Sequence, residues 1–336
     1  MKLCKYLFVS FSAILALAGC GGSSTTPPPP VNGHIYVTTA SKDLVSAFKA
    51  GDNGNVSPQG QLTVAPNGPA FISMDVPHDR LAINSNGATP AITLVDNASA
   101  MNNAVGPIPG FRVLSGASIT RISACALDGT RDLLYAAQGL GVVGTGAVLV
   151  FGPASTINGN IAPLRTFTLA IHLGGFLLDA VNDRLFLSDP VTNTISVFDN
   201  ASTLTGSVIP ARVISGANTQ LNAPHQMVLD SSGRLIVSTS QSPNIVVFQN
   251  AATANGNIAP SASSTISQGL SEMAISPAGE LYVVDGSPQV TVYGGVATAT
   301  GAINPIRVIA GPNTGLGPIF PNIPAEPLGI AVDSTR

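Results

Sequence analysis

Six polar residues each stand directly before or at the start of a short apolar run: Glu272, Glu326, His172, His225, Gln226 and Arg121. Carboxylates and imidazoles are metal ligands, and a few polar groups that converge on a cavity mouth form a typical ligand site. Glu272 and Glu326 are also the two acids, of 17 in the chain, with no counterpart elsewhere in the repeated sequence. These residues are therefore the candidates for binding chemistry.

The spacing of the six residues indicates that they share one edge of the fold. Counted back from the next turn, Glu326 lies seven residues before Asp333, as His172 does before Asp179. Two interpretations follow: a polar ligand pocket with a possible metal of the His/Glu kind, or a wet channel in which polar groups meet water. In both, we expect exposed side chains, whose replacement by Ala changes stability by under ~0.5 kcal/mol.

The other acids recur in step and are interpreted as structural. Nine acids lie in the expected turn between two strands: Asp75, Asp79, Asp128, Asp132, Asp179, Asp183, Asp230, Glu280 and Asp333. Asp side chains in turns accept hydrogen bonds from nearby backbone N–H groups. We therefore expect these carboxylates to serve the fold.

A hexapeptide reveals the repeat that positions the candidates. NGNIAP occurs at 158–163 and again at 255–260, with looser copies at 53–58, 205–210 and 300–305 and a degraded one at 103–107. Its prolines fall at 58, 107, 163, 210, 260 and 305, a period near 50 that is typical of a solenoid or propeller. Each period holds four short alternating runs of β-branched and aromatic residues, which predicts one four-stranded antiparallel blade.

The ends of the chain complete the last blade. The C-terminal stretch 329–336 supplies one strand and the start of its turn, and the N-terminal stretch 33–65 supplies the three strands that should follow. The sequence therefore predicts an all-β, six-bladed β-propeller over 33–336, closed by N-terminal strands that remove its free edges.

The unit Pro327-Leu328-Gly329-Ile330-Ala331-Val332-Asp333, followed by an IYV run, resembles the NHL-type propeller repeat. This resemblance implies the architecture and says little about activity. Because only two acids, Glu272 and Glu326, break the repeat, the sequence favours a membrane-anchored binding or scaffold module without a cofactor. The repeat is also similar to that of six-bladed, calcium-dependent gluconolactonase-like enzymes, which implies an alternative: a hydrolase with calcium at the channel mouth. The inner strands of this chain lack the asparagine set of that family.

Composition narrows the partners. The chain has 9% charged residues, 14 Lys+Arg, a net charge of −3 and 45% hydrophobic residues. So few basic residues leave no stripe for a phosphate backbone, which argues against nucleic acid. An unknown protein, glycan or small molecule remains as the partner.

The N-terminus is read as a targeting and anchoring segment. Residues 1–19 combine Lys2 and Lys5 with an apolar core, as in a signal peptide, and Leu17-Ala18-Gly19-Cys20 resembles the lipobox of bacterial lipoproteins. That resemblance implies lipidation of Cys20 and attachment to the membrane of the cell envelope, with Gly21 favouring the outer membrane of a Gram-negative cell. Residues 20–32, rich in Gly, Ser and Pro, form the expected tether. Cys125 is expected to be a buried small hydrophobe.

Overall fold

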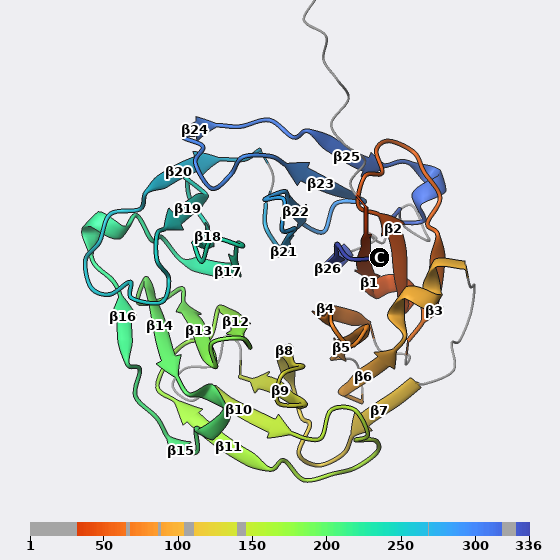
Figure 1. Ribbon diagram of the computed structural model, residues 1–336, viewed down its shortest axis with the longest axis horizontal. Helices are drawn as coiled ribbons and strands as arrows, with labels where there is room; N and C mark the ends of the chain where they lie inside the picture. Colours follow the sequence, from red (N-terminus) through yellow and green to blue (C-terminus); the bar gives the residue numbers. More distant parts are fainter. Residues whose placement is uncertain are drawn as a thin grey trace, which may run out of the picture. The chain divides into compact units, whose positions relative to one another are not determined.

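Short strands in groups of four account for most of the regular structure. The computed structural model describes residues 32–64, 68–86, 89–103, 111–139, 146–267, 269–317 and 327–336. The predicted signal peptide and most of the predicted tether lie outside these residues. The strands form six sheets arranged in a ring, which confirms the six-bladed β-propeller (Figure 1).

Each blade runs outward from an innermost strand at the axis. Blade 1 consists of β26 (Pro327–Asp333), β1 (His34–Thr39), β2 (Leu44–Lys49) and β3 (Gly60–Thr63). Blade 2 consists of β4 (Pro69–Asp75), β5 (Arg80–Ser85), β6 (Ala91–Asp96) and β7 (Phe111–Ser115). Blade 3 consists of β8 (Ile122–Asp128), β9 (Leu133–Gln138), β10 (Gly146–Phe151) and β11 (Arg165–Leu169). Blade 4 consists of β12 (Gly175–Asp179), β13 (Arg184–Asp189), β14 (Thr194–Asp199) and β16 (Arg212–Ile214). Blade 5 consists of β17 (Pro224–Leu229), β18 (Leu235–Thr239), β19 (Ile245–Phe248) and β20 (Ala262–Thr265). Blade 6 consists of β21 (Glu272–Ile275), β22 (Leu281–Val284), β23 (Gln289–Tyr293) and β25 (Arg307–Ala310).

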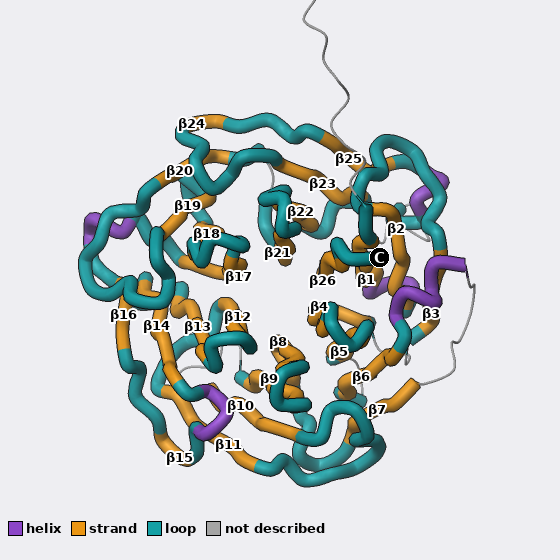
Figure 2. Tube along the Cα trace, viewed as in Figure 1, coloured by secondary structure: helices purple, strands orange, loops and turns teal. Residues whose placement is uncertain are grey.

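Two short strands and a few helical turns complete the fold. The strands β15 (Gly206–Ser207) and β24 (Gly301–Ala302) pair in parallel with the outer strands of blades 3 and 5. The 3₁₀ segments, drawn purple in Figure 2, are η1 (Ala40–Lys42), η2 (Ala98–Asn103), η3 (Ala201–Thr203), η4 (Ala217–Thr219) and η5 (Pro312–Thr314).

Blade 1 closes the ring as the sequence predicts. The C-terminal β26 pairs antiparallel with the N-terminal β1, with Ile35 opposite Val332 and Val37 opposite Ile330. This pairing gives β1 a hydrogen-bonded neighbour on both sides and leaves blade 1 with the same four-stranded order as the others. The closure therefore ties the two ends of the propeller together by main-chain hydrogen bonds.

The core lies between neighbouring blades. Six apolar clusters each combine residues of two adjacent blades; for example, Ile35 and Phe48 of blade 1 meet Tyr282 and Val292 of blade 6, all fully buried. The other five clusters join the remaining neighbours in the same way. Successive residues of a strand point to opposite faces, and a neighbouring blade covers each face, so the strands are apolar on both faces and much of the chain is hydrophobic.

Within the described residues, three copies of the hexapeptide fasten their blade to the previous one by the same hydrogen bonds. In blade 5, the N–H of Gly256 donates to the carbonyl of Val213 in blade 4 (2.7 Å), and the Asn255 Oδ1 accepts from the N–H of Val213 (3.0 Å). Asn257 Oδ1 accepts from the N–H of Asn218 (2.8 Å) and occupies a notch at Gly216, whose φ is +116°. The copies at 53–58 and 158–163 bond blades 6 and 2 in the same way.

Candidate functional site

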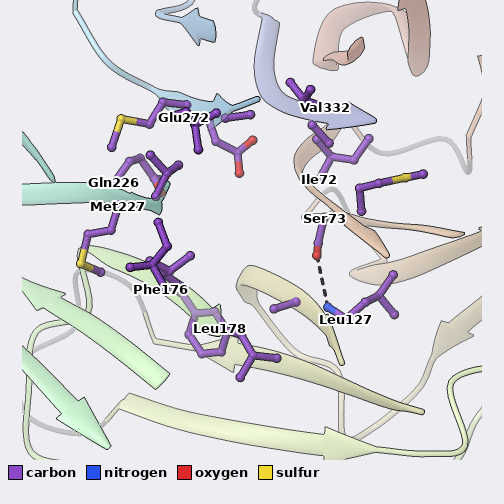
Figure 3. A pocket seen from close by; sticks show the side chains of 18 of the residues that line it. Ile72, Ser73, Leu127, Phe176, Leu178, Gln226, Met227, Glu272 and Val332 are labelled. Atoms are coloured by element: carbon purple, nitrogen blue, oxygen red, sulfur yellow. Dashed lines mark hydrogen bonds between the residues drawn. The ribbon is translucent and has the colours of Figure 1, made fainter. Parts of the chain in front are cut away.

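The innermost strands enclose a cavity on the axis of the ring. It has a volume of about 410 Å³ and is lined by residues of β4, β8, β12, β17, β21 and β26, one strand from each blade (Figure 3). Most of the residues that line it are apolar, including Ile72, Leu127, Phe176, Met227 and Val332, although polar atoms form the larger part of the exposed cavity surface. We call the edge at which these strands begin the strand-start rim, and the edge at which they end, near Asp75, Asp128 and Asp333, the turn rim.

Glu272 is the acid that points into this cavity. It is the first residue of β21, and Figure 3 shows its carboxyl group directed away from its own strand toward the cavity. Its Oε2 accepts a hydrogen bond from the N–H of Ile330 in blade 1 (2.8 Å), and the N–H of Ile72 in blade 2 also donates to the carboxyl group. Glu272 therefore links three blades.

Burial governs the ionisation of Glu272. Removal of the carboxyl group from water raises its pKa well above the ordinary value, and the two backbone hydrogen bonds only partly oppose this effect. Within the described residues, Glu272 has no ion pair with a basic side chain. Glu272 is half-buried, so the expectation of an exposed side chain does not hold for this residue.

Gln226 and His225 lie where β17 is irregular. The register of β17 against β18 shifts between Pro224 and Met227, so the two residues sit at a bulge. Gln226 lines the axial cavity with Glu272, whereas His225 lines a neighbouring cavity of about 460 Å³ that also contains Ser238. His225 is largely exposed, yet its enclosure on one side lowers its pKa.

The other candidates are placed separately. The backbone N–H of His172 donates to Asp189 Oδ2 (3.1 Å), and its ring Nδ1 lies 3.5 Å from the same oxygen. Arg121 is exposed directly before β8, and Glu326 lies outside the described residues. The structure thus brings Glu272 and Gln226 together, with His225 in the adjacent cavity. Ligand binding by the six residues stays a prediction.

Two cavity residues were not singled out as candidates. Ser73 Oγ accepts from the N–H of Leu127 (3.1 Å) and so joins blades 2 and 3 at the cavity wall (Figure 3). Ser73 stands two residues before Asp75, where the other blades carry apolar residues, and this difference was the available signal. Cys125 is 7% exposed with its pKa raised by burial, which confirms the expected buried thiol.

The recurrent acids serve the fold, as predicted. Asp128 accepts from the N–H of Arg131 (3.0 Å), and Asp230 from the N–H groups of Ser232 and Arg234 (both 2.9 Å). Asp183 adopts φ of +52° and caps the turn after β14 through the N–H of Ser202 (2.7 Å). Such bonds satisfy turn N–H groups and leave little capacity for a ligand.

Within the described ranges, no group of three or more His, Cys, Asp or Glu residues is close enough to hold a metal ion. In that same part of the chain, no helix has the length and apolar character needed to span a bilayer.

Comparison with known proteins places the fold. No model of a known protein family matches the sequence, and no curated protein matches it significantly. Among solved structures, a chain from the crystal structure of a nidogen/laminin complex is similar, with a TM-score of 0.58 and 10% identity, over 90% of this chain and 98% of that one. At this identity the likeness concerns the fold alone, and with the six sheets it defines the chain as a β-propeller.

Proposed function

We propose that this chain is a lipid-anchored β-propeller of the bacterial cell envelope, built from NHL-type repeats, that acts as a binding module. The observation that carries the proposal is the axial cavity, because all six innermost strands line it and a buried carboxyl group points into it. A concave, mostly apolar site with a few convergent polar groups is the usual form of a ligand site. A similar propeller belongs to a protein complex, which supports binding as a use of this architecture.

The lining indicates the chemistry of the ligand. Apolar walls favour an apolar body, since burying it there removes hydrocarbon surface from water. Glu272 favours one basic or hydrogen-bond-donating group, because a cation beside a buried carboxyl group restores the charge that burial disfavours. A small organic amine combines both properties.

Thermal unfolding with two matched probes tests the cavity. Benzylamine and benzyl alcohol share an apolar ring, but only the amine carries a positive charge. We expect benzylamine to raise the melting temperature of the wild type more than benzyl alcohol does. In Glu272→Gln the advantage of the amine should disappear. If neither probe raises the melting temperature, the axial cavity is not a ligand site.

Fractionation tests the anchor independently. The wild type should appear in the membrane fraction, and Cys20→Ala should move the folded propeller to the soluble fraction because the acyl chains are lost. A wild-type protein that is soluble and carries an unmodified N-terminus would contradict the anchor while leaving the cavity untouched.

A further inference from the structure

An arginine recurs at one place in the outer strand of four blades: Arg112, Arg165, Arg212 and Arg307. Three of them have a carboxylate partner within their own blade. Arg112 Nη2 lies 2.5 Å from Asp96, Arg212 Nη1 lies 2.7 Å from Asp199, and Arg307 Nη2 lies 2.7 Å from Glu280. The repeat thus normally supplies an acid for this cation.

Blade 3 lacks the acid. The position of Asp96 and Asp199 is taken by Gly152, and the position of Glu280 is taken by Leu133. Within the described residues, the Arg165 side chain has no hydrogen bond or ion pair, and its Nε and Nη2 atoms are buried. Arg165 is half-buried, and two buried guanidinium nitrogens without an acceptor cost free energy, so this arrangement favours an anion that can reach them.

Tyr135 supplies a second unpaired donor in the same row of the sheet. Tyr135 pairs with Val150, which pairs with Arg165, so both side chains project from one face of blade 3. Tyr135 is 0% exposed, and its hydroxyl group has no partner among the described residues. Burial raises its pKa, so the hydroxyl group keeps its proton and can donate it to an acceptor.

Blade 6 shows the same row with its acid in place. Tyr282, Val292 and Arg307 hold the equivalent positions. There the Tyr282 hydroxyl group donates to Glu280 Oε2 (2.8 Å), and Arg307 donates to both oxygens of Glu280 (2.8 and 2.7 Å). Blade 6 therefore displays a carboxylate held by an arginine fork and a tyrosine hydroxyl group, which is a strong, directional arrangement.

We propose that Arg165 and Tyr135 form a binding site for a small carboxylate, such as acetate, at the interface of blades 3 and 4. The ligand accepts hydrogen bonds from Arg165 and Tyr135 as the Glu280 carboxyl group does from Arg307 and Tyr282 in blade 6, and the Leu133 side chain packs near it in the interface. Two acids, Asp128 and Asp183, also face Tyr135, but both already have partners. Arg131 lies 3.1 Å from Asp128 and 3.7 Å from Asp183, and Asp183 also accepts a hydrogen bond from the N–H of Ser202. The charge of Arg165 is therefore left for the ligand.

The test compares sodium acetate with sodium HEPES at equal ionic strength and pH 8, because the HEPES anion is too large for this interface. Acetate should raise the melting temperature of the full-length chain in a saturable way, and HEPES should not. Arg165→Gln should lose the acetate response. Arg307→Gln, the matched change in blade 6, should lower the melting temperature yet leave that response in place.

Two further variants keep the proposal testable should Arg165→Gln fail to fold. Tyr135→Phe removes one hydroxyl group and should weaken acetate about tenfold, as expected for one hydrogen bond to a charged group. Leu133→Glu supplies the missing acid, so it should raise the melting temperature without acetate and abolish the response. The proposal would be overturned if acetate and HEPES changed the melting temperature of the wild type equally. It would also be overturned if Tyr135→Phe and Leu133→Glu kept the full response to acetate.

Discussion

Replacement of Glu272 by Gln should change how stability depends on pH. Because burial raises the pKa of Glu272 in the folded protein, the folded state holds a proton that the unfolded state releases above the ordinary value near 4.5. Stability is therefore greatest below that value and falls as the pH rises through the interval up to the folded pKa. Glu272→Gln is neutral throughout and keeps an oxygen acceptor, so it should not show this fall.

The size of the effect follows from the proton count. One group changes the number of bound protons by at most one, which limits the slope to about 1.4 kcal/mol per pH unit. Unfolding entropy is about 2.1 cal/mol/K per residue, or about 0.6 kcal/mol/K for a unit of about 300 residues. The melting temperature of the wild type should thus fall by up to about 2 °C per pH unit relative to the variant.

Calorimetric melts of both proteins from pH 4 to pH 9 measure this difference. His225 and His34 also have lowered pKa values, but they titrate in both proteins and cancel in the comparison. The Cys125 thiol faces Glu272 and stays protonated because burial raises its pKa. Parallel curves for the two proteins over the whole range would refute the buried, protonated carboxyl group.

Four other outcomes are expected, and melting curves, together with solubility for the deletion, check them. Asn255→Ala removes the acceptor of the Val213 N–H and should lower the free energy of unfolding by about 1 kcal/mol. Thr205 holds the matching position in the hexapeptide copy at 205–210, where this bond is absent, so Thr205→Ala should change stability little. Asp230→Ala should cost at least about 1 kcal/mol by leaving turn N–H groups unpaired, without changing the benzylamine response. Deletion of residues 33–65 removes three strands of blade 1 and should cause aggregation. A soluble, cooperatively melting deletion would contradict ring closure. The alternative, a calcium-dependent hydrolase, predicts that added calcium raises the melting temperature.

The architecture could be predicted because each blade repeats a local pattern. Alternation marked the strands, and the incomplete unit at 329–336 required the strands that begin at 33, which β26 and β1 confirm. The fastening role of the hexapeptide could not be predicted in this way. Asn255 acts on Val213 of another blade, and a repeat within one chain does not reveal which neighbour its side chains contact.

The sequence could predict at which end of the inner strands the candidate residues lie, but not which groups surround them. Glu272 and Gln226 both lie four residues before a turn position, and both line the axial cavity. The Glu272 carboxyl group is enclosed next to the N–H groups of Ile72 and Ile330, which belong to two other blades, so no local pattern signals its burial. His172 contacts Asp189 of its own blade because the two residues are brought together where β13 ends.

A crystal structure of the protein soaked with benzylamine would show directly whether the axial cavity binds a ligand. We expect density for the ring against the apolar residues of the axial cavity, with the amine nitrogen within hydrogen-bond distance of the Glu272 carboxyl group, and no such density in Glu272→Gln crystals. An axial cavity that holds only water at saturating benzylamine, with the amine bound elsewhere or not at all, would contradict it.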